Sequence, residues 1–123
     1  MGIRRPGSLS ALALAGSGIA IAADPAGAAG AMHLKPLTQR GVAETRVGLG
    51  GTFAGLGLWA LARRNSDAYT AVGMTWLGAA AVRGLSLRVD EPETDWTFWA
   101  FFAMEVGLGV AGLVDRGARR TSD

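Results

Sequence analysis

The sequence predicts an all-α fold, a bundle of four transmembrane helices with both termini in the cytoplasm. Three observations predict it. Half of the 123 residues are hydrophobic and only 18% are charged, and the mean hydropathy is positive. The charges gather between long apolar stretches, and the basic ones lie in alternate connections. Because about 20 helical residues cross the hydrocarbon core of a bilayer, residues 1–123 are expected to form one integral membrane domain.

The apolar stretches define the expected helices. With their flanks they lie at about 9–23, 44–63, 67–89 and 95–115. Residues 47–62 argue against a soluble helix, because Thr52 is their only polar side chain apart from the amphipathic Trp59. The surface helix of a globular protein keeps a polar face. β-Branched residues are sparse in this stretch, which argues against a strand.

Residues that end or cap helices lie between these segments. Pro25 is expected to end the first helix, because proline has no amide donor and disfavours helix in the residue before it. Ser66 or Asp67 is a candidate N-cap for the third helix, and Thr94 or Asp95 for the fourth.

Basic residues predict the orientation. They gather at both ends of the chain and in the middle turn, at Arg4, Arg5, Arg63, Arg64, Arg116, Arg119 and Arg120. The other two connections hold Lys35 and Arg40 in one case and an acidic run at 90–95 in the other. The positive-inside rule then predicts a multi-pass protein of the cell inner membrane with cytoplasmic termini. The formal net charge of +2 follows from that rule, so the expected partner is the lipid bilayer and no nucleic acid is expected.

The first segment has a second interpretation. Residues 1–24 combine a basic start, an apolar stretch and Ala20-Ile21-Ala22, a pattern typical of a secretory signal peptide. The segment is therefore either a retained helix or a leader removed after Ala22.

The glycine motifs predict packing rather than nucleotide binding. Residues 107–112 spell G-x-G-x-x-G, but this fingerprint binds a dinucleotide only between a strand and a helix, and here it lies inside an apolar helix. Gly51 with Gly55, and Gly107 with Ala111, are spaced for close helix packing. Such glycine-rich faces would also serve a homo-oligomer.

No cofactor and no metal is expected. The chain has no cysteine, so thiolate ligands and disulfides are excluded. His33 is the only histidine and lies in a predicted loop, without a second imidazole to share a metal.

Charged residues within the apolar segments point to a site. Glu105 lies at the middle of the fourth helix and Arg83 near the outer end of the third. A charge at a helix centre costs about 2.5 to 3.5 kcal/mol to insert, so each needs a partner or water. At about 1.5 Å per residue Arg83 lies about 9 Å and Glu105 about 14 Å below the outer boundary, within reach of an arginine side chain. We therefore predict a cluster of Arg83, Glu105 and Arg46, open to the outer leaflet, with Glu44 at its rim.

Four stretches carry a family resemblance: "DPAGAAGAM", "ETRVGLGGTFAGLGL", "RGLSLRVD" and "MEVGLG". Over nearly its whole length the chain resembles the small bacterial four-helix membrane proteins grouped as domain of unknown function 4345. The resemblance implies that the first segment is a membrane helix. It also implies a set of functional polar positions, which are Glu44, Arg46, Arg83, Ser86, Asp90 and Glu105.

The chain departs from that family at two places. Leu49 stands where family members commonly carry a tyrosine, and Asp90-Glu91 stands where Asp-Gly is usual. The first departure removes a phenol donor, which weakens any shared catalytic mechanism. The family itself has no assigned activity.

Three functions fit these residues. The first is an acid/base site for a lipophilic small molecule, of the isomerase or cyclase type, in which a desolvated carboxyl donates a proton and an arginine steadies negative charge. The second is a structural bundle or complex subunit, in which Arg83 and Glu105 only fix helix packing. The third is a proton-coupled or ion-coupled transporter acting as an oligomer. The residues do not choose between them.

Overall fold

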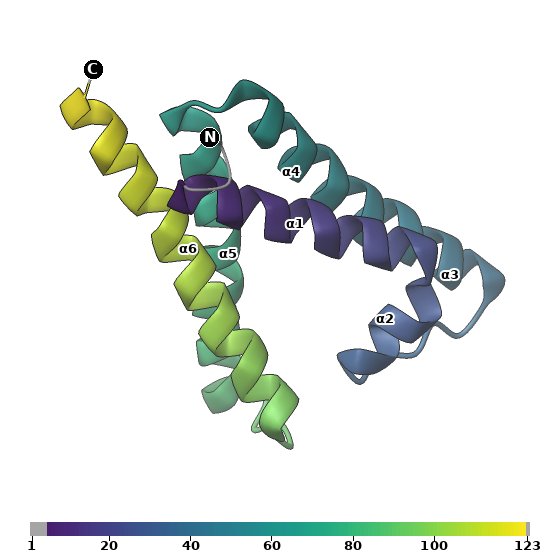
Figure 1. Ribbon diagram of the computed structural model, residues 1–123. Coiled ribbons are helices and arrows are strands. Elements are labelled where there is room, and N and C mark those ends of the chain that lie inside the picture. The colour runs from purple at the N-terminus through teal and green to yellow at the C-terminus, as the bar shows by residue number, and fades with distance from the viewer. Residues whose placement is uncertain (1–4, 123) are drawn as a thin grey trace.

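The computed structural model describes the backbone of residues 5–122 and the side chains of residues 5–115. Every regular element in that range is helical, which confirms the all-α prediction. The elements are α1 (Pro6–Ala23), α2 (Pro25–Ala31), α3 (Gln39–Thr45), η2 (Arg46–Gly51), α4 (Thr52–Arg63), α5 (Ser66–Val89) and α6 (Trp96–Ser122). Figure 1 shows α1 and α4 running side by side, α5 and α6 forming a second pair, and the two pairs diverging away from the chain termini.

The second predicted helix is longer than expected and has a π-helical interior. The backbone stays helical where α3 passes into η2 and where η2 passes into α4, so residues 39–63 form one continuous helix. It begins earlier than predicted because Thr38 caps it, its Oγ1 accepting from the Gly41 amide at 3.0 Å. It ends where Arg64 takes a left-handed conformation with φ of 54°.

The predicted helix starts are partly correct. Asp95 caps α6, accepting from the amides of Thr97 at 3.1 Å and Phe98 at 3.2 Å. The cap of α5 is Asn65, whose Oδ1 accepts from the Ala68 amide at 2.8 Å, and is neither Ser66 nor Asp67. The short helix α2 was not predicted.

By length and hydropathy, two helices of the described chain could cross a membrane, one at Pro6–Ala23 and one at Trp96–Asp115. Near an N-terminus, an apolar helix such as α1 also has the character of a signal sequence. Helix α5 has 24 residues, but Asp67, Arg83 and Arg88 lie within it. The structure therefore shows an all-helical chain with two candidate spans.

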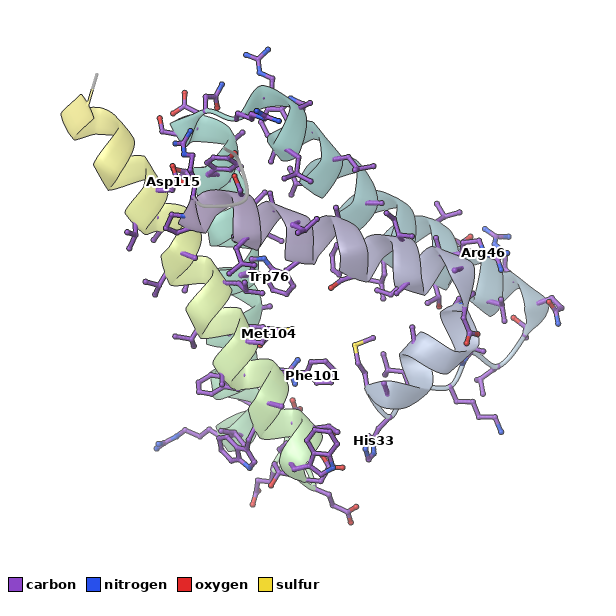
Figure 2. The ribbon with its side chains drawn as sticks, viewed as in Figure 1. His33, Arg46, Trp76, Phe101, Met104 and Asp115 are labelled. Carbon is purple, nitrogen blue, oxygen red and sulfur yellow. The ribbon has the colours of Figure 1, made fainter. Side chains whose placement is uncertain are left out.

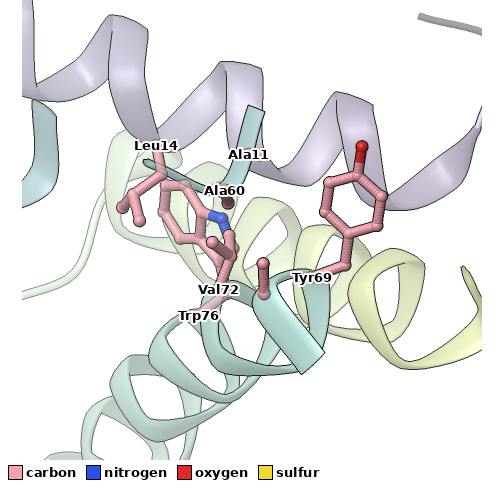
Figure 3. Close-up of a cluster of buried hydrophobic side chains, with 7 residues drawn as sticks. Ala11, Leu14, Ala60, Tyr69, Val72 and Trp76 are labelled. Carbon is pink, nitrogen blue, oxygen red and sulfur yellow. The ribbon is translucent and has the colours of Figure 1, made fainter. Parts of the chain in front are cut away.

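Helix α1 lies at the centre of the packing. It contacts α4 and η2 along one side and α5 and α6 along another. The core cluster joins Ala11 and Leu14 of α1 to Tyr69, Val72 and Trp76 of α5 (Figure 3). These side chains are at most 6% exposed, so the two helix pairs are held together through α1.

Glycines allow close backbone contact within both pairs. A Cβ atom on Gly18 of α1 would lie 2.1 Å from the backbone nitrogen of Ala54, and one on Gly57 of α4 would lie 2.4 Å from that of Ala15. Real Cβ atoms do not approach so closely, so any larger residue at these positions must separate α1 from α4. Gly73 of α5 allows the same kind of close backbone contact between α5 and α6.

The glycines singled out from the sequence do not make these contacts. A Cβ atom on Gly55 or Gly107 would meet nothing within 4 Å, and one on Gly51 would meet only the Arg46 carbonyl oxygen at 3.9 Å. The predicted packing pairs are therefore wrong within the described chain. Their part in a homo-oligomer stays a prediction.

Candidate functional site

The central feature of the site is an ion pair between α5 and α6. Arg83 Nε donates to Glu105 Oε1 at 2.8 Å, and Arg83 Nη2 donates to Glu105 Oε2 at 2.8 Å. Two parallel hydrogen bonds of this kind are the strongest and most directional arrangement for a guanidinium and a carboxylate. Glu105 is only 5% exposed, and the Arg83 side chain is 23% exposed. The pair predicted from helix depth is therefore present.

Neighbouring groups fix the position of Arg83. Its guanidinium carbon lies 5.1 Å from the ring centre of Phe98 and 5.5 Å from that of Phe101, both on α6. A cation over an aromatic face at this distance is attracted to it. Ser86, one of the positions implied by the family resemblance, donates to the Arg83 carbonyl oxygen at 2.7 Å and so serves the backbone of α5.

An apolar cavity of about 250 Å³ lies beside the ion pair. Its walls come from α1, α2, α4, α5 and α6, and both Arg83 and Glu105 line it. The apolar lining includes Ile21, Ala28, Met32, Phe53, Trp76 and Met104. The ion pair therefore supplies the charged part of a wall that is apolar elsewhere except at Ser17.

A second, more polar cavity of about 260 Å³ lies toward the turn between α5 and α6. It shares four lining residues with the apolar cavity, namely Ala31, Met32, Arg83 and Phe101. Its other lining residues include His33, Glu93 and Asp95. Figure 2 shows Phe101 on α6 and His33 beyond α2 on the two sides of this opening. Arg83 thus lies where the two cavities meet.

A polar contact bridges the opening. His33 Nε2 lies 3.0 Å from Asp95 Oδ2, which links the segment after α2 to the start of α6. The Thr97 hydroxyl and the Phe98 amide donate to Asp95 and lower the pKa of its carboxyl. Asp95 is therefore a carboxylate at neutral pH.

The structure does not assemble the predicted cluster of three. Arg46 Nε donates to the carbonyl oxygen of Ala22 at 2.8 Å, at the end of α1, and its side chain is exposed. Glu44 pairs with Arg40 one turn earlier at 2.5 Å, on the surface. Neither pairs with Arg83, because α3 and η2 lie at the end of helix 39–63 that packs near α1 and α2, and it is α4 that contacts α5 (Figure 2). The site is a pair, and Glu44 is not at its rim.

Asp90 also lies outside the pair. It is exposed at the end of α5, where its backbone amide donates to the Ser86 carbonyl oxygen at 2.8 Å. Its role in the structure is that of a C-cap.

Sequence reasoning missed a second buried carboxylate, Asp115 on α6, which is 1% exposed. Arg5 donates to the Asp115 carboxylate through both Nη2 and Nε, the latter at 3.2 Å. The Gly7 amide also donates to this carboxylate at 2.9 Å. Beside it the hydroxyls of Ser8 and Tyr69 lie 2.9 Å apart. The available signal was an acid at the end of an apolar run, facing the arginines of the chain start.

Among the described residues, no three His, Cys, Asp or Glu side chains come close enough together to hold a metal ion. Comparison of the chain with protein-family models, with characterised proteins and with solved structures finds no match. The resemblance to domain of unknown function 4345 therefore stays a prediction, and function is argued from the site alone.

Proposed function

We propose that this chain is a four-span membrane protein that binds a lipophilic small molecule in the apolar cavity, with a polar group of the ligand at Arg83 and Glu105. One observation carries the proposal: a two-point ion pair forms part of the wall of a cavity whose other lining residues are apolar except for Ser17. Ligand sites combine apolar walls with a few fixed polar groups in this way.

Surface composition supports the membrane setting. Large apolar side chains are exposed on the long helices, including Leu12, Leu58, Val82 and Val110. The chain exposes 7588 Å², whereas a compact soluble protein of 12.6 kDa exposes about 6200 Å². A lipid environment accounts for both the extent and the apolar character of this surface.

Length and charge placement support four spans. Residues 39–63 and the 24 residues of α5 each extend over about 36 Å, more than the roughly 30 Å of a bilayer core. Arg5 lies against the α4–α5 turn, its Nη1 donating to the Arg64 carbonyl oxygen at 3.4 Å. Basic residues of the chain start and the middle turn thus share one end of the bundle, as the positive-inside rule requires.

The hydrogen bonding of Arg83 favours binding over a purely structural role. Two of its three guanidinium nitrogens donate to Glu105, and Nη1 has no hydrogen-bond partner within the described residues. No fully buried side-chain nitrogen or oxygen of the described chain lacks a partner, so Nη1 is not fully buried. It is available to donate to a hydroxyl, carbonyl or ether oxygen of a ligand.

The geometry supports acid/base chemistry less directly than it supports binding. Both oxygens of Glu105 accept hydrogen bonds from Arg83, so the carboxyl group has no oxygen free of the guanidinium. An isomerase or cyclase would need the ligand to displace the guanidinium before Glu105 could donate a proton. Catalysis and transport stay predictions, and binding is the function that the geometry supports best.

Photo-crosslinking tests the proposal. The probe is hexadecanol carrying a diazirine in its chain, added to the full chain in lipid nanodiscs, with adducts mapped by mass spectrometry. We expect adducts on cavity-lining segments of α1 and α6, and loss of these adducts in Ala28→Phe, which fills the cavity from α2. The matched control is Ala26→Phe on the exposed side of the same helix. Adducts confined to exposed helix faces, or unchanged in Ala28→Phe, would contradict the proposal.

A further inference from the structure

The two cavities that meet at Arg83 differ in polarity. The apolar cavity has walls of aliphatic, aromatic and methionine side chains. The polar cavity is lined by carboxylates at the start of α6. A ligand that fills both must have an apolar tail and a polar end, and the flexible Met32 between them can adjust to it.

The polar end faces an excess of negative charge. The charged groups that line the two cavities are the guanidinium of Arg83 and the carboxylates of Glu93, Asp95 and Glu105. One guanidinium against three carboxylates leaves the sum negative, whether or not His33 carries a proton. Arg83 is already paired with Glu105 at 2.8 Å, so the remaining negative charge lies with Glu93 and with Asp95, which His33 contacts.

Local contacts keep that charge in place. The start of α6 holds Asp95 ionised through the bonds from Thr97 and Phe98, while His33 contacts only its other oxygen. Glu93 is exposed and has no hydrogen-bond partner within the described residues. Glu93 and Asp95 are both exposed, so they attract a charge of opposite sign at the mouth of the cavity, and salt weakens this attraction.

We infer that the ligand is an amphiphilic cation, with its tail in the apolar cavity and a quaternary or protonated amine beside Glu93 and Asp95. The inference rests on the proposed binding function and adds the sign of the ligand's charge. The rings of Phe98 and Phe101 already lie against the guanidinium of Arg83, so the carboxylates and not these rings hold the amine.

Competition against the diazirine alcohol tests the charge preference. Three competitors share a twelve-carbon tail: dodecyltrimethylammonium, dodecanol and dodecanoate, each used below its micellar concentration in nanodiscs of zwitterionic lipid. We expect the cation to halve cavity labelling at about one tenth of the concentration that the anion requires, or less. The double variant Glu93→Gln/Asp95→Asn should lose most of that ratio, and asparagine still caps α6.

The matched control is Glu91→Gln, which removes the same charge from the same turn but does not line the cavity. It should keep the preference for the cation. Equal competition by all three compounds would overturn the inference and leave the binding site intact. A preference that survives the double variant, or falls equally in Glu91→Gln, would also overturn it. Failure of every probe to reach the cavity would instead remove the proposed function.

Discussion

Replacing Glu105 with glutamine tests the energetic claim at the centre of the site. The change keeps the shape of the side chain but removes its charge, leaving Arg83 positive between α5 and α6. Breaking a fully buried ion pair by removing one partner costs about 3 to 5 kcal/mol. The cost should be smaller here, because the Arg83 side chain is 23% exposed and lies over two aromatic rings. Such rings contribute about 0.5 to 2 kcal/mol.

Glutamine also keeps one acceptor oxygen, so one of the two hydrogen bonds to Arg83 can survive. We therefore expect Glu105→Gln to lower the free energy of unfolding by about 2 to 3 kcal/mol. The assay is equilibrium unfolding of the detergent-solubilised protein, followed by far-ultraviolet circular dichroism. The double variant Arg83→Met/Glu105→Leu is the control and should lie close to the wild type, because it leaves no unpaired charge. A stability of Glu105→Gln within about 0.5 kcal/mol of the wild type would refute the reasoning.

Exchanging the two charges separates packing from binding. Arg83→Glu/Glu105→Arg can rebuild the pair and should recover much of the lost stability. The free guanidinium nitrogen then lies on α6 rather than α5, so cavity labelling by the diazirine alcohol should fall below that of the wild type. Recovery of both stability and labelling would leave the pair with a packing role only.

Four further outcomes follow from other parts of the fold. Asp115→Asn should cost about 1.5 to 3 kcal/mol in the same unfolding assay, the range for a hydrogen bond to a charged group. The pKa of Asp95 is lowered, first of all by the Thr97 hydroxyl. The ionised carboxylate therefore stabilises the folded chain at pH values above the ordinary aspartate pKa of about 3.9, and this stabilisation is lost as the pH falls through the lowered pKa. Wild type should therefore exceed Asp95→Asn in stability at neutral pH and match it in strong acid. Gly57→Ala should destabilise the chain, whereas Gly55→Ala should be neutral or stabilising by up to about 1 kcal/mol. Intact mass of the membrane-extracted protein should include α1.

The pairing of Arg83 with Glu105 could be predicted because it depends on one coordinate, the depth along a helix, which residue counting supplies. Membership of Arg46 could not, because it depends on which helices are neighbours. Arg46 lies toward the same outer end of its helix, although shallower than Arg83, but that helix packs against α1, where Arg46 bonds to the Ala22 carbonyl oxygen. Residue depth predicts too large a cluster when the rotation of each helix and the order of neighbouring helices are unknown.

Glycine spacing fails for a related reason. Helix 39–63 contains several glycines whose spacings fit close packing, and the sequence does not show which of them face a neighbour. The structure places Gly50 and Gly57 against α1, seven residues apart on one face, while Gly55 lies on another. A spacing rule identifies the mechanism of close contact but not the register.

The role of α1 combines these points. Its composition fits a removable leader, yet a leader requires only an apolar core and small residues near its end. This helix also makes specific polar contacts: Ser10 donates to the Leu108 carbonyl oxygen at 2.8 Å, and Trp76 donates to the Ser10 carbonyl oxygen at 3.2 Å. Without the segment, Asp115 would lose its bonds from Arg5 and Gly7, and a carboxylate deprived of its partners cannot stay buried at low cost. Helix α1 also forms a wall of the apolar cavity, so the proposed binding site requires α1 to be part of the fold.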